Sequence, residues 1–333
     1  MTDFYDLIYN AIKLQAKGIP DTLRSVNSEE KNVIKGKRLI FIGCGDSFGV
    51  ADYGKWAFIP LGTNASSMSP SELTRVPLDG DCVVVGITAS GRSLETIAAL
   101  EHAKKSRAVT IVLTDNPKGA ACEFADHVWL TKSDVGTYNT SPSGPTTTAM
   151  AYLLKLAVLE QADPGAGIYQ DSLRLEENSR QIVIWAEDMG KEISLMPNPG
   201  ETVYLISEGP NYVAAEIGMM KFNEYSLLRG VSVLREEFRH HTTLSLRNED
   251  SVILITDGHS EEKDQTYKKV LVETLGTRTN ILRTPAGLSL ESTLGQAIAN
   301  TIALQMAAFY FAKKHSPDKD GFRMPHANAF KIY

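Results

Sequence analysis

The stretch "VVVGITASGRSLETI", residues 83–97, joins a run of apolar residues to a turn rich in Thr, Ser and Gly and then to a helical pattern. A short apolar run that is rich in Val and ends at a turn is typical of a strand inside a parallel sheet. In such sheets, ligands bind at the carboxyl ends of the strands, where the helices that follow present free backbone N–H groups. The stretch therefore predicts an α/β fold with a ligand site beside residues 88–93.

The same alternation of strand and helix extends along the chain. Apolar runs predict strands at 37–43, 81–88, 108–114 and 127–131, and helical spacing predicts helices at 144–162 and 170–190. This pattern indicates a parallel sheet that is covered by helices on both faces.

The two halves of the chain repeat each other. "FIGCGDSFGVADYGKWAF" (41–58) aligns without a gap with "LISEGPNYVAAEIGMMKF" (205–222), so that Ile42 falls on Ile206. "DCVVVGIT" (81–88) aligns with "DSVILIT" (250–256), with Asp81 on Asp250, and "VTIVLT" aligns with "TNILRT" (279–284) at nearly the same offset. Matches at three successive strands favour a duplicated α/β unit over a chance alignment of apolar runs.

The repeat predicts five regions along the chain. They are an N-terminal helical segment (1–30), a first unit (31–165), a helical connector (166–198), a second unit (199–315) and a C-terminal tail (316–333).

Composition and charge exclude several classes of partner. The formal net charge is −6, with 34 Lys and Arg against 40 Asp and Glu, so we expect neither a nucleic acid nor an anionic membrane as a partner. The chain lacks an apolar run of about 18 residues, and residues 1–25 show helical spacing rather than a signal peptide. The three cysteines, Cys44, Cys82 and Cys122, are expected to be buried free thiols, which favours a cytoplasmic location.

Two hydroxyl-bearing loops predict a phosphate site in the first unit. "GCGDS" contains Ser47, and "TASGRS" contains Thr88, Ser90 and Ser93, with Gly91 allowing close approach of the backbone. The alternative is that Ser90 or Ser93 only caps the following helix, which is the better explanation for either residue taken singly. Two such loops on adjacent strands favour phosphate binding, and the absence of GxGxxG and GxxxxGK[ST] gives a dinucleotide or nucleoside triphosphate little support.

The duplicated unit, "CGDS", "TASGRSLET" and the C-terminal tail together resemble the double sugar isomerase (SIS) domain family, as found in the isomerase half of glucosamine-6-phosphate synthase. The resemblance implies two tandem three-layer αβα units, with sugar phosphate bound in the first by Ser47, Thr88, Ser90 and Ser93. Ala89 stands where the synthases have Gln, and Arg92 stands where they have Glu. The positions expected to contact the substrate are completed by Ala89 itself and by Gly45, Ser141, Arg92 and Glu237.

The second unit carries the candidate catalytic groups. Lys221 and Glu224, in "MKFNEYS", are at positions i and i+3 of a predicted helix, and an exposed ion pair is the simpler explanation of that spacing. The resemblance implies instead that Glu224 moves a proton between C1 and C2 of the sugar. It also implies that His240, at the family's spacing from Glu224 and within "REEFRHHTT", opens the ring. His240 matches the family's histidine better than His241 does, although the family's "HGP" is replaced here by "HHTT".

The end of the chain matches the synthases as well. "NAFKIY" (328–333) places Lys331 where their tail has a lysine that forms a Schiff base with the open-chain carbonyl. A disordered tail is the alternative, but the apolar neighbours Phe330, Ile332 and Tyr333 favour a docked one.

These features predict an amino-sugar-phosphate isomerase or deaminase that acts on a hexose 6-phosphate without a cofactor or a metal. The only adjacent pair of histidines, at 240–241, lacks a spaced partner such as HxxxH. "EEFRH" also resembles fructosamine-6-phosphate deglycases, which remain an alternative, and a sugar-phosphate-binding regulator is a third. The resemblance further implies a homodimer with shared active sites.

Overall fold

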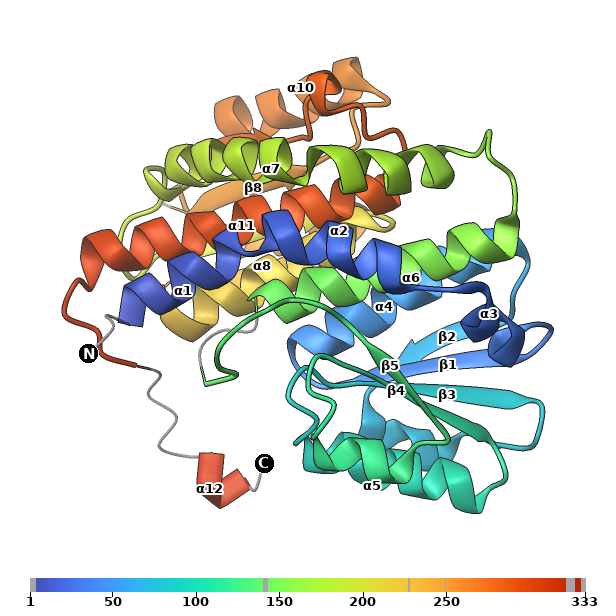
Figure 1. The fold of residues 1–333 in the computed structure, drawn as a ribbon. Coiled ribbons are helices and arrows are strands. Elements are labelled where there is room, and N and C mark those ends of the chain that lie inside the picture. Colours follow the sequence, from blue (N-terminus) through green and yellow to red (C-terminus); the bar gives the residue numbers. More distant parts are fainter. Residues whose placement is uncertain (1–3, 140–142, 227, 249, 322–326, 331–333) are drawn as a thin grey trace. The chain divides into compact units, whose positions relative to one another are not determined.

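A computed structural model describes residues 4–139, 143–226, 228–248, 250–321 and 327–330 of the chain (Figure 1). Its contacts divide the chain into two compact units. The first-sheet unit comprises the described residues of 14–179 and 323–333, and the second-sheet unit comprises those of 1–13 and 180–322. The five regions expected from the sequence remain a prediction.

The first-sheet unit is built on five parallel strands in the order β2-β1-β3-β4-β5. The strands are β1 (Arg38–Gly43), β2 (Ala65–Met68), β3 (Cys82–Ile87), β4 (Val109–Thr114) and β5 (His127–Leu130). Every residue of the central strand β3 is buried, which agrees with its continuous apolar sequence.

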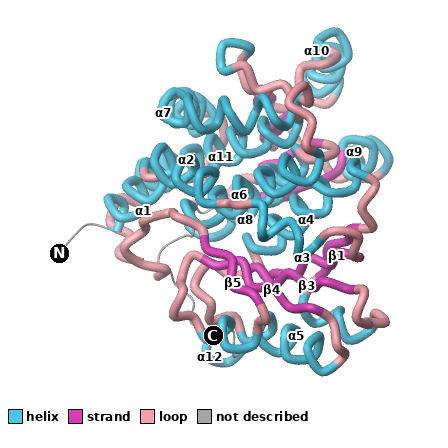
Figure 2. Tube along the Cα trace, turned by 45° about the vertical axis from the view of Figure 1, so that its right-hand side comes forward, coloured by secondary structure: helices cyan, strands magenta, loops and turns pink. Residues whose placement is uncertain are grey.

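Helices cover both faces of this sheet. The helices of this unit are α2 (Gln15–Ser25), α3 (Ser28–Ile34), α4 (Asp46–Phe58), α5 (Leu94–Lys105), α6 (Ser143–Gln161), the first part of α7 (Gly167–Ser194), α12 (Ala327–Phe330) and three 3-10 helices at Ile59–Leu61, Pro70–Arg75 and Ala120–Phe124. Helix α5 lies on one face, while α4 and α6 lie on the other (Figures 1 and 2). Between α5 and the sheet, Leu100 packs with Ile42, Val84 and Val112 in one apolar cluster.

The second-sheet unit has four parallel strands in the order β7-β6-β8-β9. The strands are β6 (Thr202–Ser207), β7 (Arg229–Leu234), β8 (Ser251–Ile255) and β9 (Arg278–Leu282). Its helices are α1 (Phe4–Lys13), the later part of α7, α8 (Asn211–Tyr225), α9 (Arg235–His240), α10 (Glu261–Lys269), α11 (Thr293–His315) and shorter ones at Thr242–Leu244, Val270–Thr274 and Ala286–Leu288.

Close packing of two long helices builds the core of this unit. A Cβ atom on Gly218 of α8 would lie 2.6 Å from Leu304 Cδ1 of α11, so the glycine is what allows the two helices to approach. On the other face of the sheet, Leu271 packs with Val252 and Leu254.

The predicted α/β fold with two parallel sheets is confirmed, and the two sheets correspond strand by strand. The order β2-β1-β3-β4 in one unit matches β7-β6-β8-β9 in the other. Strand β6 begins and ends at the residues that the sequence alignment of Ile42 with Ile206 assigns to the two ends of β1. This correspondence is consistent with tandem SIS units.

Two strands were absent from the predicted set. Strand β2 has the sequence "ASSM" and is only half-buried, and β7 has the sequence "RGVSVL" and alternates between exposed and half-buried positions over most of its length. Each lies at the edge of its sheet, where one side of the strand has no neighbour and the apolar signal is weak.

The prediction that all three cysteines are buried is wrong for Cys44. Its side chain is exposed in the loop after β1, whereas Cys82 is buried and Cys122 is half-buried. All three are free thiols. Within the described residues, none of the helices is long and apolar enough to cross a membrane.

Candidate functional site

The two hydroxyl-bearing loops lie together at the carboxyl edge of the first sheet. Strands β1 and β3 are neighbours, and Gly43 is paired with Ile87 at their ends, so the loops that follow begin at the same level. Ser93 Oγ donates a hydrogen bond to Cys44 Sγ at 3.5 Å, which joins one loop to the other. The structure therefore brings "GCGDS" and "TASGRS" into contact within one unit.

Helix capping does not account for Ser93. Ser93 occupies the N-cap position of α5 with an extended backbone, but its side chain makes no capping hydrogen bond. Its oxygen instead accepts a hydrogen bond from Thr96 Oγ1 at 3.2 Å. Ser90 is different, because its Oγ accepts a hydrogen bond from the backbone N–H of Arg92 at 3.3 Å, as in a local turn.

Gly91 is required by the packing of its own loop. It has φ +68°, and a Cβ atom at this position would lie 2.5 Å from the Cα atom of Gly119. Asn116 Nδ2 donates to the carbonyl of Ser90 at 2.9 Å, and the N–H of Ala121 donates to the carbonyl of Gly91 at 3.0 Å. The backbone that approaches Gly91 closely therefore belongs to the segment after β4, which holds the loop in place.

A small open pocket adjoins these loops, with Ser47 and Ala89 in its wall. The rest of its lining comes from the carboxyl ends of β3 and β4, from residues after β4 and β5, and from α4 and α6: Asp46, Val50, Ile87, Leu113, Thr114, Asp115, Thr131, Pro145, Thr146 and Ala149. Thr88, Ser90 and Ser93 do not line it. The pocket thus lies next to the predicted phosphate loops.

Five polar residues of this wall are not among the site residues predicted from the sequence, although three of them stand at positions where the sequence predicts a ligand-binding loop. Asp46 lies inside "CGDS", and Thr114 and Asp115 lie where a predicted strand ends. Thr131 follows β5, and Thr146 is in the first turns of α6, where its hydroxyl donates to Asp46 Oδ2 at 3.1 Å. That bond connects the N-terminal turns of α4 and α6, which are far apart in the sequence.

In the second-sheet unit, Lys221 and Glu224 form an ion pair on α8, with 2.7 Å between Nζ and Oε2. The Lys221 side chain is 0% exposed and the Glu224 side chain is 36% exposed. The pair is therefore not the exposed surface pair that spacing alone suggests. A buried ammonium group is costly unless it is paired, so this lysine depends on its neighbours for its charge.

His240 and His241 both lie near the surface of the second-sheet unit. His240 ends α9, its side chain is 70% exposed, and its Nε2 lies 3.1 Å from Glu236 Oε1. His241 follows, with Nε2 at 3.6 Å from Glu237 Oε2. Phe238, between the two pairs, is buried against Tyr204 and anchors the short helix.

The remaining predicted site residues lie at a helix start, on the surface or outside the described residues. Gly45 is the N-cap residue of α4 with φ +58°, and Arg92 and Glu237 are exposed. Lys331 and Ser141 lie outside the described residues. Phe330, one of the apolar neighbours that favour a docked tail, has a side chain that is 74% exposed.

The carboxyl edge of the second sheet differs in its side chains. Asn300 Nδ2 donates to Asn211 Oδ1 at 3.0 Å, and Thr284 Oγ1 donates to Asn300 Oδ1 at 3.1 Å. In the aligned repeats, Asn211 corresponds to Ser47 and Thr284 to Thr114. Side-chain amides and a hydroxyl thus satisfy one another at this edge, where the first-sheet unit has an open pocket.

One family model matches most of the first-sheet unit. The family model for the SIS domain matches residues 33–159. Over 277 residues the chain is 25% identical to the glutamine–fructose-6-phosphate aminotransferase (isomerizing) of Aquifex aeolicus. This alignment covers 80% of this chain and 45% of that protein. The chain is 24% identical over 219 residues to the fructoselysine 6-phosphate deglycase of Escherichia coli, covering 61% of this chain and 60% of that protein. The chain therefore spans about half the length of these curated relatives.

Solved structures show the same fold over nearly the whole chain. The C-terminal domain of glucosamine-fructose-6-phosphate aminotransferase from Francisella tularensis matches with a TM-score of 0.78 and 20% identity, covering 92% of this chain and 95% of that chain. Glucosamine-6-phosphate deaminase from Thermotoga maritima matches with a TM-score of 0.76 and 16% identity, covering 94% and 97%. Residues 33–159 thus match the SIS domain, and the chain resembles the F. tularensis aminotransferase domain and the T. maritima deaminase in fold and the E. coli fructoselysine 6-phosphate deglycase in sequence.

Proposed function

We propose that the protein is a phosphosugar isomerase that converts an amino-sugar 6-phosphate into the ketose 6-phosphate and ammonia, or catalyses the reverse reaction. Relatives named for glucosamine-6-phosphate deamination and for fructose-6-phosphate amination support this substrate class. The observation that carries the proposal is the Lys221–Glu224 pair, in which a fully buried ammonium group holds a carboxylate that is still partly open to solvent.

Substrate binding in this proposal depends on the first-sheet unit. The hydroxyls of Ser47, Ser90 and Ser93, together with Thr88, supply neutral donors beside the N-termini of α4 and α5. Such donors bind a phosphate group through hydrogen bonds and the positive ends of the helices.

The chemistry depends on two proton transfers in the substrate. His240 exchanges a proton with the ring oxygen and opens the sugar, because an imidazole can both donate and accept near neutral pH. Glu224 then removes the proton from C2 and returns it to C1, which converts the open-chain amino aldehyde into a C2 imine. Water adds to C2 of the imine and ammonia leaves, so glucosamine 6-phosphate and water give fructose 6-phosphate and ammonia.

Two lysines complete the proposed set. Lys221 holds the Glu224 carboxylate from the side that is buried in the protein. For Lys331 we propose the role implied by its position in "NAFKIY": in the aminating direction its amine forms a Schiff base with the C2 carbonyl of the open-chain ketose with loss of water, and ammonia then displaces the lysine to give the C2 imine.

The variant Glu224→Gln tests this function. We expect it to bind fructose 6-phosphate with wild-type affinity in calorimetry, because the substitution leaves the proposed phosphate donors Ser47, Ser90 and Ser93 unchanged. Release of ammonia from glucosamine 6-phosphate should fall by about 10²–10⁴-fold, and the substrate should no longer exchange its C2 hydrogen with deuterated solvent.

Glu273→Gln is the matched control, because Glu273 forms an ordinary exposed pair with Lys269 at 3.8 Å. It should keep full activity. A folded Glu224→Gln protein with wild-type turnover would show that the pair only stabilises α8, and the proposed mechanism would be wrong.

Deglycation of a fructosamine 6-phosphate is a second candidate. It is favoured by the likeness to the E. coli fructoselysine 6-phosphate deglycase and by "EEFRH" in α9. Incubation with fructoselysine 6-phosphate separates the two activities, since a deglycase releases lysine and a deaminase releases ammonia only from an amino sugar. If neither substrate turns over but both bind, the third alternative, a sugar-phosphate-binding regulator, holds.

A further inference from the structure

The segment 131–138, which follows β5, supplies part of the wall of the pocket. Thr131 lines the pocket, as does Asp115, which follows the neighbouring strand β4. The segment has no regular secondary structure. Its conformation therefore depends on side-chain contacts rather than on a helix or a strand ladder.

Asp115 makes most of these contacts through one carboxylate. Its Oδ1 accepts hydrogen bonds from Thr131 Oγ1 at 2.8 Å and from the N–H of Ser133 at 2.9 Å. Its Oδ2 accepts from Ser133 Oγ at 2.6 Å and from the Tyr138 hydroxyl at 3.0 Å. Four donors from three positions of the segment thus converge on one side chain, and all four are uncharged.

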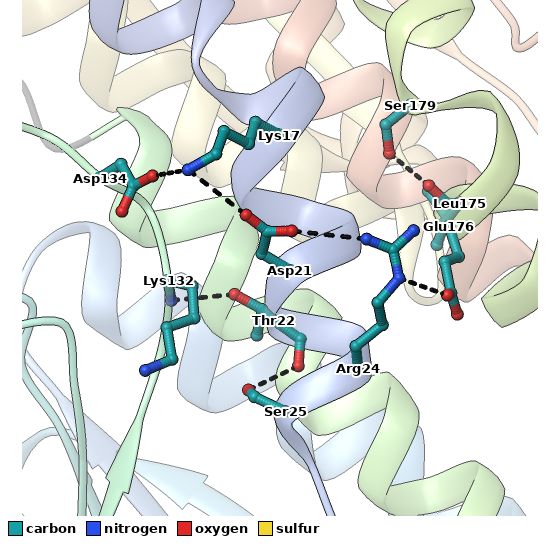
Figure 3. A network of polar contacts seen from close by, with 10 residues as sticks. All are labelled: Lys17, Asp21, Thr22, Arg24, Ser25, Lys132, Asp134, Leu175, Glu176 and Ser179. Carbon is teal, nitrogen blue, oxygen red and sulfur yellow. Dashed lines mark hydrogen bonds and ion pairs between the residues drawn. The ribbon is translucent and has the colours of Figure 1, made fainter.

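The segment also contacts α2, as Figure 3 shows. Thr22 Oγ1 accepts a hydrogen bond from the N–H of Lys132 at 3.0 Å, and Lys17 of α2 pairs with Asp134. A Cβ atom on Gly18 would lie 2.8 Å from the carbonyl oxygen of Lys132, so the helix packs directly on the backbone of the segment. The start of the segment is therefore held between Asp115 and α2.

In this network the Tyr138 hydroxyl is a hydrogen-bond donor and the Asp115 carboxylate is the acceptor. Burial and the adjacent Asp115 carboxylate raise the pKa of Tyr138 well above its usual value. The phenol therefore stays protonated and donates a hydrogen bond to Asp115. Because hydrogen bonds to a carboxylate are about twice as strong as neutral ones, four of them make a rigid support.

We propose that Asp115 is a positioning residue that sets the shape of the sugar-binding wall of this pocket by holding segment 131–138. The proposal rests on the proposed function, in that the occupant of the pocket is the sugar part of a hexose phosphate whose phosphate group lies at the adjacent loops. Asp115 acts on that ligand through Thr131 and through the path of the segment that Thr131 begins.

The main experiment compares Asp115→Ala with Asp126→Ala. Asp126 is the matched control, because it accepts hydrogen bonds from the N–H of Thr110 at 3.0 Å and from Thr110 Oγ1 at 2.8 Å, at the amino edge of the same sheet. Asp115→Ala should weaken binding of fructose 6-phosphate about tenfold or more in calorimetry and raise KM for glucosamine 6-phosphate similarly, with kcat changed by less than about threefold. Asp126→Ala should destabilise the protein without changing the affinity.

The conservative variant provides a rescue. Asn at position 115 keeps an acceptor for Thr131 and Ser133 N–H, and its amide can donate to the two hydroxyls, whose hydrogens can rotate. We therefore expect Asp115→Asn to recover most of the lost affinity. If Asp115→Ala acted only by destabilising the whole protein, we would not expect Asp115→Asn to restore KM while kcat stays unchanged in both variants.

Hydrogen exchange of the peptide spanning 131–138 decides the positioning role without any ligand. Exchange should be faster in Asp115→Ala than in wild type and unchanged in Asp126→Ala. If Asp115→Ala fails to fold, Tyr138→Phe, which removes one of the four bonds, should still speed exchange and weaken binding about threefold. Unchanged exchange in a folded variant would overturn the proposal. Faster exchange in a protein whose wild type binds no sugar phosphate would instead refute the proposed function.

Discussion

Hydroxyl side chains, rather than lysines or arginines, are the candidate phosphate donors of this chain. At the carboxyl edge of the first sheet, Ser47 lies in the first turn of α4 and Ser90 lies in the turn that leads to α5. Neutral donors of this kind bind an anion without attracting every other anion in solution, which suits a substrate that must be released as a phosphorylated product.

We expect Ser47→Ala or Ser90→Ala to raise KM for a sugar phosphate. The loss of one hydrogen bond to a charged group corresponds to about 1.5–3 kcal/mol, or roughly 10–100-fold in KM. Steady-state kinetics with glucosamine 6-phosphate and glucosamine measure both the effect and the preference for phosphate. Equal turnover of the two sugars by the wild type would contradict the phosphate site.

Among the elements, the loop between β3 and α5 depends on a single glycine. Gly91 combines a positive φ with a backbone neighbour at 2.5 Å, whereas Gly36 has a similar φ of +70° with no atom within 4 Å of its would-be Cβ. The two positions therefore separate backbone strain from steric conflict.

Gly36→Ala should cost about 1 kcal/mol of unfolding free energy, since only the left-handed backbone is strained. Gly91→Ala should cost about 3 kcal/mol or more, because Gly119 must move as well, and it should also weaken phosphate binding. Urea unfolding and calorimetry test both variants. Equal destabilisation by the two substitutions would mean that the Gly91–Gly119 contact relaxes at no cost.

At the scale of the whole second-sheet unit, Glu187 of α7 joins α1 and α11. Its carboxylate accepts hydrogen bonds from Lys13 at 2.6 Å and from Tyr310 at 2.7 Å, and it pairs with Lys191 at 3.1 Å. Burial raises the pKa of Glu187, but these partners outweigh burial and lower the pKa to about 2.

A carboxyl group whose pKa is lowered on folding stabilises the folded state above its unfolded pKa and loses that contribution as it becomes protonated. Wild type should therefore be more stable than Glu187→Gln above about pH 4.5, and the difference should shrink as the pH falls toward about 2. Thermal unfolding from pH 2 to pH 7 measures it. A difference that does not change with pH would exclude the charge as its cause.

The assembly of the whole molecule is predicted from the family resemblance alone. We expect a homodimer in which His240 of one subunit serves the site of the other. Mixed and exchanged Glu224→Gln and His240→Ala proteins should then regain about a quarter of wild-type activity, because half of the randomly formed dimers carry one intact site. Verified exchange without recovered activity would show that each chain carries a complete site.

Much of the fold follows from local sequence. Apolar runs predicted β1, β3 and β4, because a strand buried on both faces must be apolar along nearly its whole length. They also predicted the edge strand β5, although His127 and Val128 are exposed there. The constant offset between the aligned halves predicted that β6 is the counterpart of β1. The positions of the two hydroxyl-bearing loops could also be predicted, since turns and helix starts depend on residues that are close in the sequence.

Tertiary structure alone decided the burial of Lys221 and the composition of the pocket. Lys221 is fully buried although its spacing from Glu224 is that of a common surface pair, because burial depends on which elements pack around α8. Asp115, Thr131 and Thr146 line one pocket, although their positions along the chain are far apart. A short sequence window carries no information about such distant neighbours, and the energy of these contacts exists only once the chain has folded.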